Sequence, residues 1–282
     1  MKSGNNIRAD IRMVELGLAV SRERARSLIM SGVVYKNGIR IDKAGAPVSS
    51  GDLITVKEDP IPFVSRGGLK LKKAIDANAL DLTGCFAADI GASTGGFTDC
   101  MLTYGAEKVF AVDVGYGQLD WKLRNDPRVI VLERHNARNM EPSWYEGYLD
   151  FASVDVSFIS LKLILAPLYD CLKQGGIVVA LVKPQFEAGR DKVGKNGVVR
   201  SPETHRGVLT DIALFSEKSG YAIIGMDYSP ITGPKGNIEF LLILKKDRGT
   251  AMGDTAKISE MVTRTVDRSH DELAAKHCGR DE

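Results

Sequence analysis

The chain has 282 residues, roughly the length of two domains. Hydrophobic residues make up 44% and charged residues 26%, a composition that excludes a wholly disordered or collagen-like protein. The net charge is only +2, but residues 1–73 hold 14 Lys and Arg against 7 Asp and Glu, while the remainder holds 24 against 29. A basic segment ahead of a mildly acidic body favours a polyanion partner for that segment; the alternative is a solvated charged face.

The sequence predicts a cytoplasmic protein that uses neither a membrane nor a metal. No run approaches the roughly 18 apolar residues of a transmembrane helix, and the first residues lack the apolar core of a secretion signal. The four cysteines are far apart without metal-binding spacing, so we expect reduced thiols. They are Cys85, Cys100, Cys171 and Cys278.

Residues 8–31 are expected to form two short helices, with Ser21 as the N-cap of the second. The segment VVYKNGIRI then predicts a β-hairpin with Asn37 and Gly38 in its turn. The run LITV adds a short strand. A proline-containing linker is expected at 60–67.

This first segment resembles the S4 RNA-binding domain. The stretch GLAVSRERARSLIMSGVVYKNGIRI, followed by SGDLITV, carries the resemblance over residues 8–57. It implies a small α+β domain at 1–59 in which Arg22, Arg26 and Lys36 contact RNA. The alternative is that these cations only solvate a helix face.

From residue 85 onward, apolar runs alternate with helical stretches, which predicts an α/β fold with a doubly wound sheet. The seven expected strands are CFAADI, KVFAVDV, RVIVL, YLDFASVDV, GGIVVALV, YAIIGMDY and IEFLLIL. The tail at 247–282 is polar, but it contains apolar residues spaced for one amphipathic helix. They are Ile258, Met261, Val262, Thr265 and Val266.

A glycine-rich turn follows the first of these strands. After Asp89, the segment Gly91-Ala-Ser93-Thr-Gly95-Gly96-Phe97 opens a helix, where glycines let the backbone approach a ligand. It is not the GxGxxG fingerprint, which disfavours a nicotinamide cofactor. Asp113 ends the second strand 22 residues after Gly91, and a carboxylate there can accept hydrogen bonds from ribose hydroxyls. The two features favour a ligand that contains a nucleoside.

The segment DIGASTGGFT, with the later VDV, resembles the cofactor site of Rossmann-type methyltransferases. The resemblance implies S-adenosylmethionine as cofactor, with Asp89 near its methionine end and Asp113 on its ribose. Asn136, after the third strand, is expected near the adenine. The full set of expected cofactor residues is Asp89, Gly91, Ser93, Gly95, Gly96, Phe97, Asp113, Asn136 and Asp155.

The fourth strand disfavours methylation of a nucleobase. Amino-methyltransferases usually carry Asn/Asp-Pro-Pro-aromatic there, whereas Val156 and Ser157 stand in place of the prolines. A cytosine C5 enzyme needs a nucleophilic cysteine, and Cys171 follows a helical stretch without such a setting.

Lys70, Asp155, Lys183 and Glu239 resemble the catalytic tetrad of FtsJ-type RNA 2′-O-methyltransferases, with Glu239 expected in the last strand. Over residues 8–246 the chain resembles the TlyA family through SRGGLKL, DIGASTGGF, VDVSFISL, VKPQFEAGRDKVGKNGVV and GPKGNIEFL. The resemblance implies a Rossmann-like seven-stranded methyltransferase domain at 68–246 that methylates cytidine 2′-hydroxyls of ribosomal RNA within assembled subunits. We hypothesise that Lys183 activates the hydroxyl and that the other three residues position it.

Further RNA contacts are expected from Arg66 and from Arg190 and Lys192 in the polar loop 184–206. A monomer is expected. Two alternatives to the enzyme remain open: a hemolysin-type membrane-active protein, and an RNA-binding protein without methyl transfer.

Overall fold

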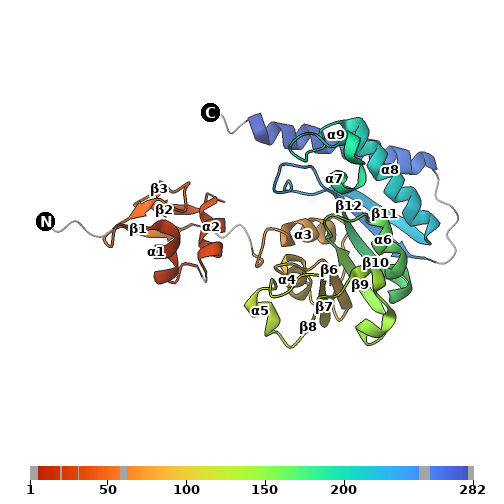
Figure 1. Ribbon diagram of the computed structural model, residues 1–282, viewed down its shortest axis with the longest axis horizontal. Coiled ribbons are helices and arrows are strands. Elements are labelled where there is room, and N and C mark those ends of the chain that lie inside the picture. Colours follow the sequence, from red (N-terminus) through yellow and green to blue (C-terminus); the bar gives the residue numbers. More distant parts are fainter. Residues whose placement is uncertain (1–5, 20, 31, 58–61, 248–254, 279–282) are drawn as a thin grey trace. The chain divides into compact units, whose positions relative to one another are not determined.

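The computed structural model describes residues 6–19, 21–30, 32–57, 62–247 and 255–278, with side chains of the last helix described through residue 273. The chain divides into two compact units, Met1–Pro62 and Phe63–Glu282 (Figure 1). Residues 60 and 61 of the expected linker and the side chain of Cys278 lie outside the described part.

The first unit contains the two predicted helices and the predicted hairpin. The strand β1 (Ile7–Arg8) pairs with β4 (Pro47–Val48), and α1 (Ala9–Glu15) and α2 (Arg22–Met30) follow one another along the chain. The second sheet has the order β3 (Ile39–Arg40), β2 (Val34–Lys36), β5 (Ile54–Val56).

Local sequence signals explain these elements. The Ser21 hydroxyl accepts a hydrogen bond from the Arg24 amide at 3.1 Å, which satisfies one free N–H at the start of α2. Asn37 and Gly38 have φ of +50° and +82°, as the tight turn of a twisted hairpin requires. One apolar cluster, which includes Met13, Ile29 and Val34, fills the space between helices and strands.

The second unit is built on one seven-stranded sheet, and all seven predicted strands are confirmed. The spatial order is β11-β12-β10-β9-β6-β7-β8, and β12 runs antiparallel to both of its neighbours while the strands from β10 to β8 are parallel. The strands are β6 (Phe86–Ile90), β7 (Lys108–Asp113), β8 (Val129–Glu133), β9 (Leu149–Val154), β10 (Leu172–Val182), β11 (Tyr221–Tyr228) and β12 (Phe240–Lys246).

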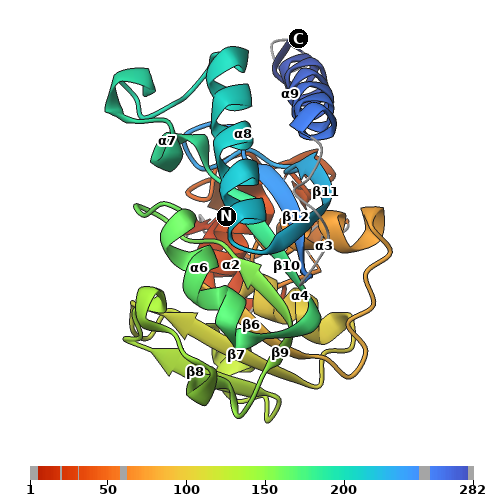
Figure 2. The ribbon, with the colours of Figure 1, turned by 90° about the vertical axis from the view of Figure 1, so that its right-hand side faces the viewer.

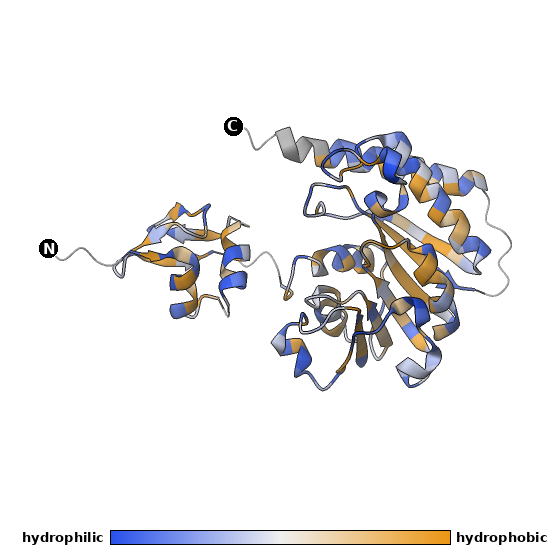
Figure 3. Cartoon of the chain, in the orientation of Figure 1, coloured by the Kyte–Doolittle hydropathy of each residue, from blue (hydrophilic) through white to orange (hydrophobic). Residues whose placement is uncertain are grey.

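Helices cover both faces of this sheet (Figure 2). One face packs against α3 (Gly68–Ala77), α4 (Gly96–Thr103) and α5 (Trp121–Arg124); the other packs against α6 (Lys162–Cys171), α8 (Pro202–Lys218) and α9 (Thr255–Cys278). Successive strand residues point to opposite faces, so Val178 and Val179 of β10 belong to different clusters. This explains why the central strands are apolar along their whole length and appear orange in Figure 3.

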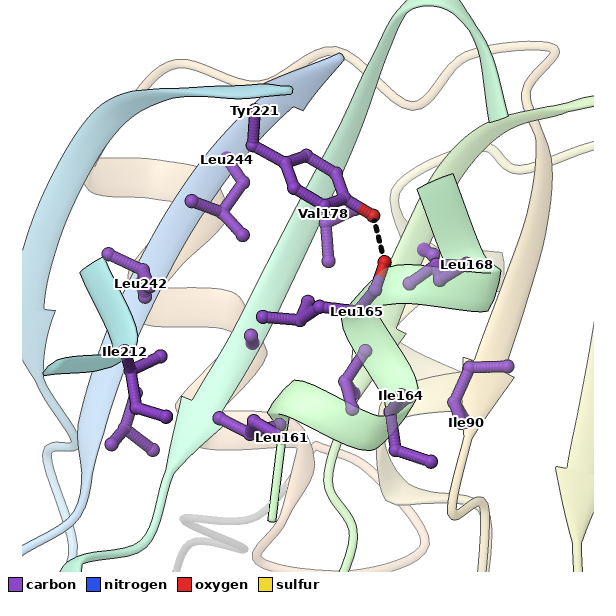
Figure 4. Close-up of a cluster of buried hydrophobic side chains, with 14 of the residues drawn as sticks. Ile90, Leu161, Ile164, Leu165, Leu168, Val178, Ile212, Tyr221, Leu242 and Leu244 are labelled. Carbon is purple, nitrogen blue, oxygen red and sulfur yellow. Dashed lines mark hydrogen bonds between the residues drawn. The ribbon is translucent and has the colours of Figure 1, made fainter. Parts of the chain in front are cut away.

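The face toward α6 and α8 is shown in Figure 4, where the Tyr221 hydroxyl donates a hydrogen bond to the Leu165 carbonyl at 2.8 Å. The tail helix predicted from the sequence is α9. Its Ile258, Val262 and Val266 are buried in this same cluster, so α9 is part of the core of the second unit.

The antiparallel direction of β12 brings its first residue to the carboxyl edge of the parallel strands. Phe240 pairs with Val182, the last residue of β10. Glu239 was expected inside the last strand, but it lies immediately before β12. Glu239 therefore lies at the same edge of the sheet as Lys183, which follows β10, and its carboxylate is 2.6 Å from the Lys70 ammonium of α3.

Gly68 and Gly96 allow α3 and α4 to approach one another backbone to backbone. A Cβ added at Gly68 would lie 2.3 Å from the Phe63 ring and 2.8 Å from the Gly96 carbonyl oxygen. The SRGGLKL segment therefore fixes the position of α3, which carries Lys70, against the end of the glycine turn, where α4 starts.

We expect Gly68→Ala to lower the free energy of unfolding of the second unit by about 1–3 kcal/mol through overpacking. As a control, the helical and exposed Gly207 has no atom within 4 Å of an added Cβ. Gly207→Ala should raise the free energy of unfolding by about 0.5–1 kcal/mol. Urea unfolding followed by tryptophan fluorescence reports on this unit, because Trp121 and Trp144 both lie in it. Equal effects of the two substitutions would contradict the close contact of α3 and α4.

Candidate active site

The glycine turn after β6 is shaped by backbone contacts. Gly91 has φ of +87°, and a Cβ there would lie 2.5 Å from the Asp155 carbonyl oxygen, so only glycine fits without movement. The Asp113 carboxylate ties the turn to β7 because it accepts hydrogen bonds from the Ser93 amide at 2.8 Å and the Gly115 amide at 2.7 Å. Asp113 therefore holds the turn in place, in addition to the ribose contact that the sequence predicts.

Asp89 lies in the floor of the site and is almost completely buried. Its carboxylate accepts hydrogen bonds from the Thr98 amide and hydroxyl at 2.9 and 2.7 Å, and from the Ser153 hydroxyl at 3.1 Å. Burial nevertheless dominates and raises the pKa of Asp89 from 3.8 to about 7, with a smaller contribution from the nearby charge of Asp155.

A cavity of about 200 Å³ opens at the carboxyl edge of the sheet. Six of the expected cofactor residues line it: Asp89, Gly91, Ser93, Gly96, Phe97 and Asp155. Gly95, Asp113 and Asn136 are outside its lining. Sequence reasoning missed Ser65 and Gly67, which also line the cavity. Both residues belong to the SRGG segment ahead of Lys70, and this segment was the sequence signal that could have identified them.

The four tetrad residues meet at one end of this cavity. The Lys70 ammonium lies 2.6 Å from Glu239 Oε2 and 3.8 Å from Asp155 Oδ2. The Lys183 ammonium lies 2.5 Å from Asp155 Oδ1 and donates a hydrogen bond to the Ser157 hydroxyl at 3.0 Å. The spatial order is Glu239, Lys70, Asp155, Lys183.

Lys70, Lys183 and Glu239 are buried and Asp155 is 21% exposed, and the tetrad has two positive and two negative charges. Glu239 is 2% exposed, which would be costly without the Lys70 ammonium beside it. Lys183 and Asp155 line the cavity, whereas Lys70 and Glu239 are outside its lining. The geometry therefore separates a pair that can touch a substrate from a pair that supports it.

Two aromatic rings stand beside the tetrad. Phe158 is 91% exposed and has φ of +63°, an unfavourable backbone conformation for a bulky residue. Its ring centroid is 4.9 Å from that of Phe186 in α7 (Pro184–Glu187), the short helix after Lys183. Sequence reasoning did not select either ring, although Phe158 occupies the aromatic position of the fourth-strand motif.

The predicted RNA-binding residues lie on both units. Arg22 and Arg26 bind the buried Asp10 carboxylate, and Lys36 donates a hydrogen bond to the Pro47 carbonyl at 3.1 Å. Arg66, Arg190 and Lys192 of the second unit are exposed.

The buried Asn237 fixes the loop that carries Arg190 and Lys192. Its side chain accepts a hydrogen bond from the Val199 amide and donates one to the Gly197 carbonyl, both at 2.9 Å. Because Asn237 is two residues before Glu239, these hydrogen bonds join the basic loop to the segment that carries Glu239.

His205 has a structural role. It is fully buried, and its Nδ1 is 2.9 Å from His270 Nε2, which joins α8 to α9. Burial lowers the pKa of His205 to about 4. Within the described residues, no group of three or more His, Cys, Asp and Glu could hold a metal ion. None of the described helices is both long and apolar enough to cross a bilayer.

Comparisons with known proteins agree with this geometry. The family model of FtsJ-like methyltransferases matches residues 63–246, and that of the S4 domain matches residues 7–54. YqxC of Bacillus subtilis, which is named as an rRNA methyltransferase, is 48% identical over 270 residues, covering 95% of this chain and 96% of the relative.

Two further relatives are similar along most of their length. The 16S/23S rRNA (cytidine-2′-O)-methyltransferase TlyA of Mycobacterium tuberculosis is 43% identical over 246 residues, covering 87% of this chain and 92% of the relative. A solved structure from Streptococcus thermophilus, named as a hemolysin, is 45% identical, covers 98% of this chain and 99% of its own, and superposes with a TM-score of 0.76.

The fold and the site thus define an FtsJ-like methyltransferase that carries an S4 domain. The S4 domain is an RNA-binding module, as its sequence predicted. Within this class the chain belongs to the TlyA family.

S-adenosylmethionine is the cofactor of this class of enzyme, and the site fits it. The carboxyl groups of Asp89 and Asp155 complement the positive charges of a sulfonium and an ammonium. The missing Cβ of Gly91 leaves room beside the Asp155 backbone, and Asp113, at the end of β7, would hold the ribose. When bound, the cofactor supplies an electrophilic methyl group.

The raised pKa of Asp89 predicts a specific pH effect on stability. Between pH 3.8 and about 7 the folded protein holds a proton that the unfolded chain releases, so rising pH disfavours folding. Asn cannot ionise, so Asp89→Asn should gain stability relative to the wild type as pH rises from about 4 to about 8. Urea unfolding by tryptophan fluorescence at each pH checks this. A stability difference that is independent of pH would contradict it.

Proposed function

We propose that this protein transfers a methyl group to the 2′-hydroxyl of a cytidine ribose in ribosomal RNA, within assembled subunits. The observation that carries the proposal is the ion-paired Lys70–Asp155–Lys183–Glu239 cluster at the edge of the cofactor cavity. The names of relatives that are 43–48% identical support the RNA substrate, and one of them specifies cytidine. The proposed reaction takes place in the cytoplasm, with the protein as a monomer.

In this mechanism Lys183 orients the ribose hydroxyl. Its ammonium is held between Asp155 and Ser157 and faces the cavity, so it can hydrogen-bond the hydroxyl oxygen and stabilise negative charge that develops there. As the ribose oxygen forms its bond to the methyl carbon, Lys183 takes the hydroxyl proton and passes one of its own protons to Asp155. The methyl group would come from the sulfonium of the bound cofactor, whose sulfur would keep the electron pair of the broken carbon–sulfur bond. Alignment of the nucleophile for in-line displacement supplies a further part of the rate.

Lys70 and Glu239 keep this pair in place. The Lys70 ammonium lies between the two carboxylates, and without it Glu239 and Asp155 would repel one another in a buried setting. We therefore assign positioning roles to Lys70 and Glu239.

The target nucleotide is held by groups around the cavity. We infer that the exposed Phe158 ring, next to Phe186, stacks on the base of the target nucleotide. Arg66, Arg190 and Lys192 bind phosphates near the target, and Arg22, Arg26 and Lys36 bind phosphates through the S4 domain.

Neither alternative is favoured. The name hemolysin belongs to a relative and describes that relative. A membrane-active protein or a pure RNA-binding module would have no evident use for a cofactor cavity with a catalytic tetrad beside it.

The central test is Lys183→Met. We expect the rate of methyl transfer to fall about 10²–10⁴-fold, because the group that orients the hydroxyl is removed. Lys173→Met is the matched control, because Lys173 lies near the start of β10, the strand that Lys183 follows, and pairs with Asp150 on the surface. The measurement is transfer of labelled methyl to ribosomal subunits, with mass-spectrometric mapping of the product nucleotide. Full turnover in folded Lys183→Met would refute the role of Lys183, and methyl on a base atom would refute the reaction.

A further inference from the structure

The first unit contains a carboxylate surrounded by three arginines. Asp10 of α1 is fully buried, and it accepts hydrogen bonds from Arg8 Nε at 2.9 Å and Arg8 Nη2 at 3.1 Å. It also accepts from Arg22 Nη2 at 3.3 Å and Arg26 Nε at 3.1 Å. Its own helix adds the Ile11 amide at 3.1 Å. We call Arg8, Arg22 and Arg26 the arginine triad.

The triad joins two segments of the chain. Arg8 precedes α1, whereas Arg22 and Arg26 are one turn apart on α2. A single buried carboxylate from α1 therefore sets the directions of side chains from both segments. The guanidinium of Arg8 and the hydrogen bonds of the other two hold the pKa of Asp10 well below its usual range, so the carboxylate stays charged.

The contact with Asp10 leaves the three arginine side chains about half exposed to solvent. Their side chains remain 48%, 52% and 49% exposed, although the carboxylate is 0% exposed. Three guanidinium groups and one carboxylate leave a net charge of +2, at a surface with a negative group at its base. Such a surface suits an RNA backbone, because guanidinium groups bind phosphate oxygens with directed hydrogen bonds.

We propose that Asp10 is a positioning residue that holds Arg8, Arg22 and Arg26 as one preformed phosphate-binding surface for RNA, and that Arg8 belongs to that surface. The proposal rests on the proposed function, since it concerns the RNA that the S4 domain binds. A flexible arginine loses side-chain freedom when it binds a phosphate, and an arginine already fixed on Asp10 has lost it beforehand.

The proposal and simple charge counting predict opposite changes in RNA affinity when the charge of Asp10 is removed. Removal of the Asp10 charge makes the surface more positive, so charge counting predicts tighter RNA binding. Asn at position 10 keeps one acceptor oxygen but lacks the charge and the second oxygen, so it cannot hold all three guanidinium groups, and the proposal predicts weaker binding.

The experiment compares Asp10→Asn with Asp42→Asn in the full chain. Asp42 lies in the same unit, is 64% exposed and pairs with Arg40, so its substitution removes the same charge without touching the triad. The probe is a labelled fragment of ribosomal RNA, with binding measured over a range of salt concentrations. We expect affinity to fall at least tenfold for Asp10→Asn and to stay equal or rise for Asp42→Asn. Unchanged or tighter binding by Asp10→Asn would overturn the proposal.

Two further variants separate positioning from a general role in folding. Arg8→Lys keeps the charge and the carboxylate but cannot form the two-pronged contact, so we expect weaker binding with an unchanged circular dichroism spectrum. Arg22→Ala should weaken binding more in the wild type than in Asp10→Asn, because the released Arg22 contributes less. Equal effects in both backgrounds, or wild-type affinity in Arg8→Lys, would overturn the proposal. A wild-type chain that does not bind RNA would instead refute the proposed function.

Discussion

The pairing of buried charges at the carboxyl edge of the sheet is the constraint on which the site depends. Glu239 and Lys70 are almost fully enclosed, and each would be costly there alone. Their meeting requires that β12 run antiparallel, so that its start reaches the end of β10, and that α3 be packed close to the glycine turn. The fold therefore brings together four charged side chains, each of which needs an oppositely charged neighbour to be stable at this position.

The elements of this fold could be predicted because their signals are local. Apolar runs identified all seven strands of the second unit, and Ser21 and the Asn37–Gly38 turn marked the first unit. Glu239 was placed within the strand since it stands in an apolar run, whereas the ladder begins one residue later. Periodicity shows that a residue is near a strand end but does not fix which residue starts the ladder.

Contacts between distant segments could not be predicted in the same way. The resemblance to a known family proposed the four tetrad residues, but it did not show that Lys183 and Asp155 line the cavity while Lys70 and Glu239 lie behind them. Lys70 and Glu239 are 169 positions apart. The ion pairs of Asp10 were also missed, because no sequence period links it to Arg22 and Arg26. Side-chain pairing of this kind depends on packing in three dimensions.

The packing of α9 bears on how the second unit is made. This helix supplies Ile258, Val262 and Val266 to the cluster that α6 and α8 also fill, yet it is translated after every strand that it covers. A nascent chain on its ribosome therefore carries β11 already packed against α8, but with the part of the face that α9 covers still open to solvent until α9 has emerged. The S4 domain has its own separate core and does not depend on α9. The two units can therefore fold at different times during synthesis.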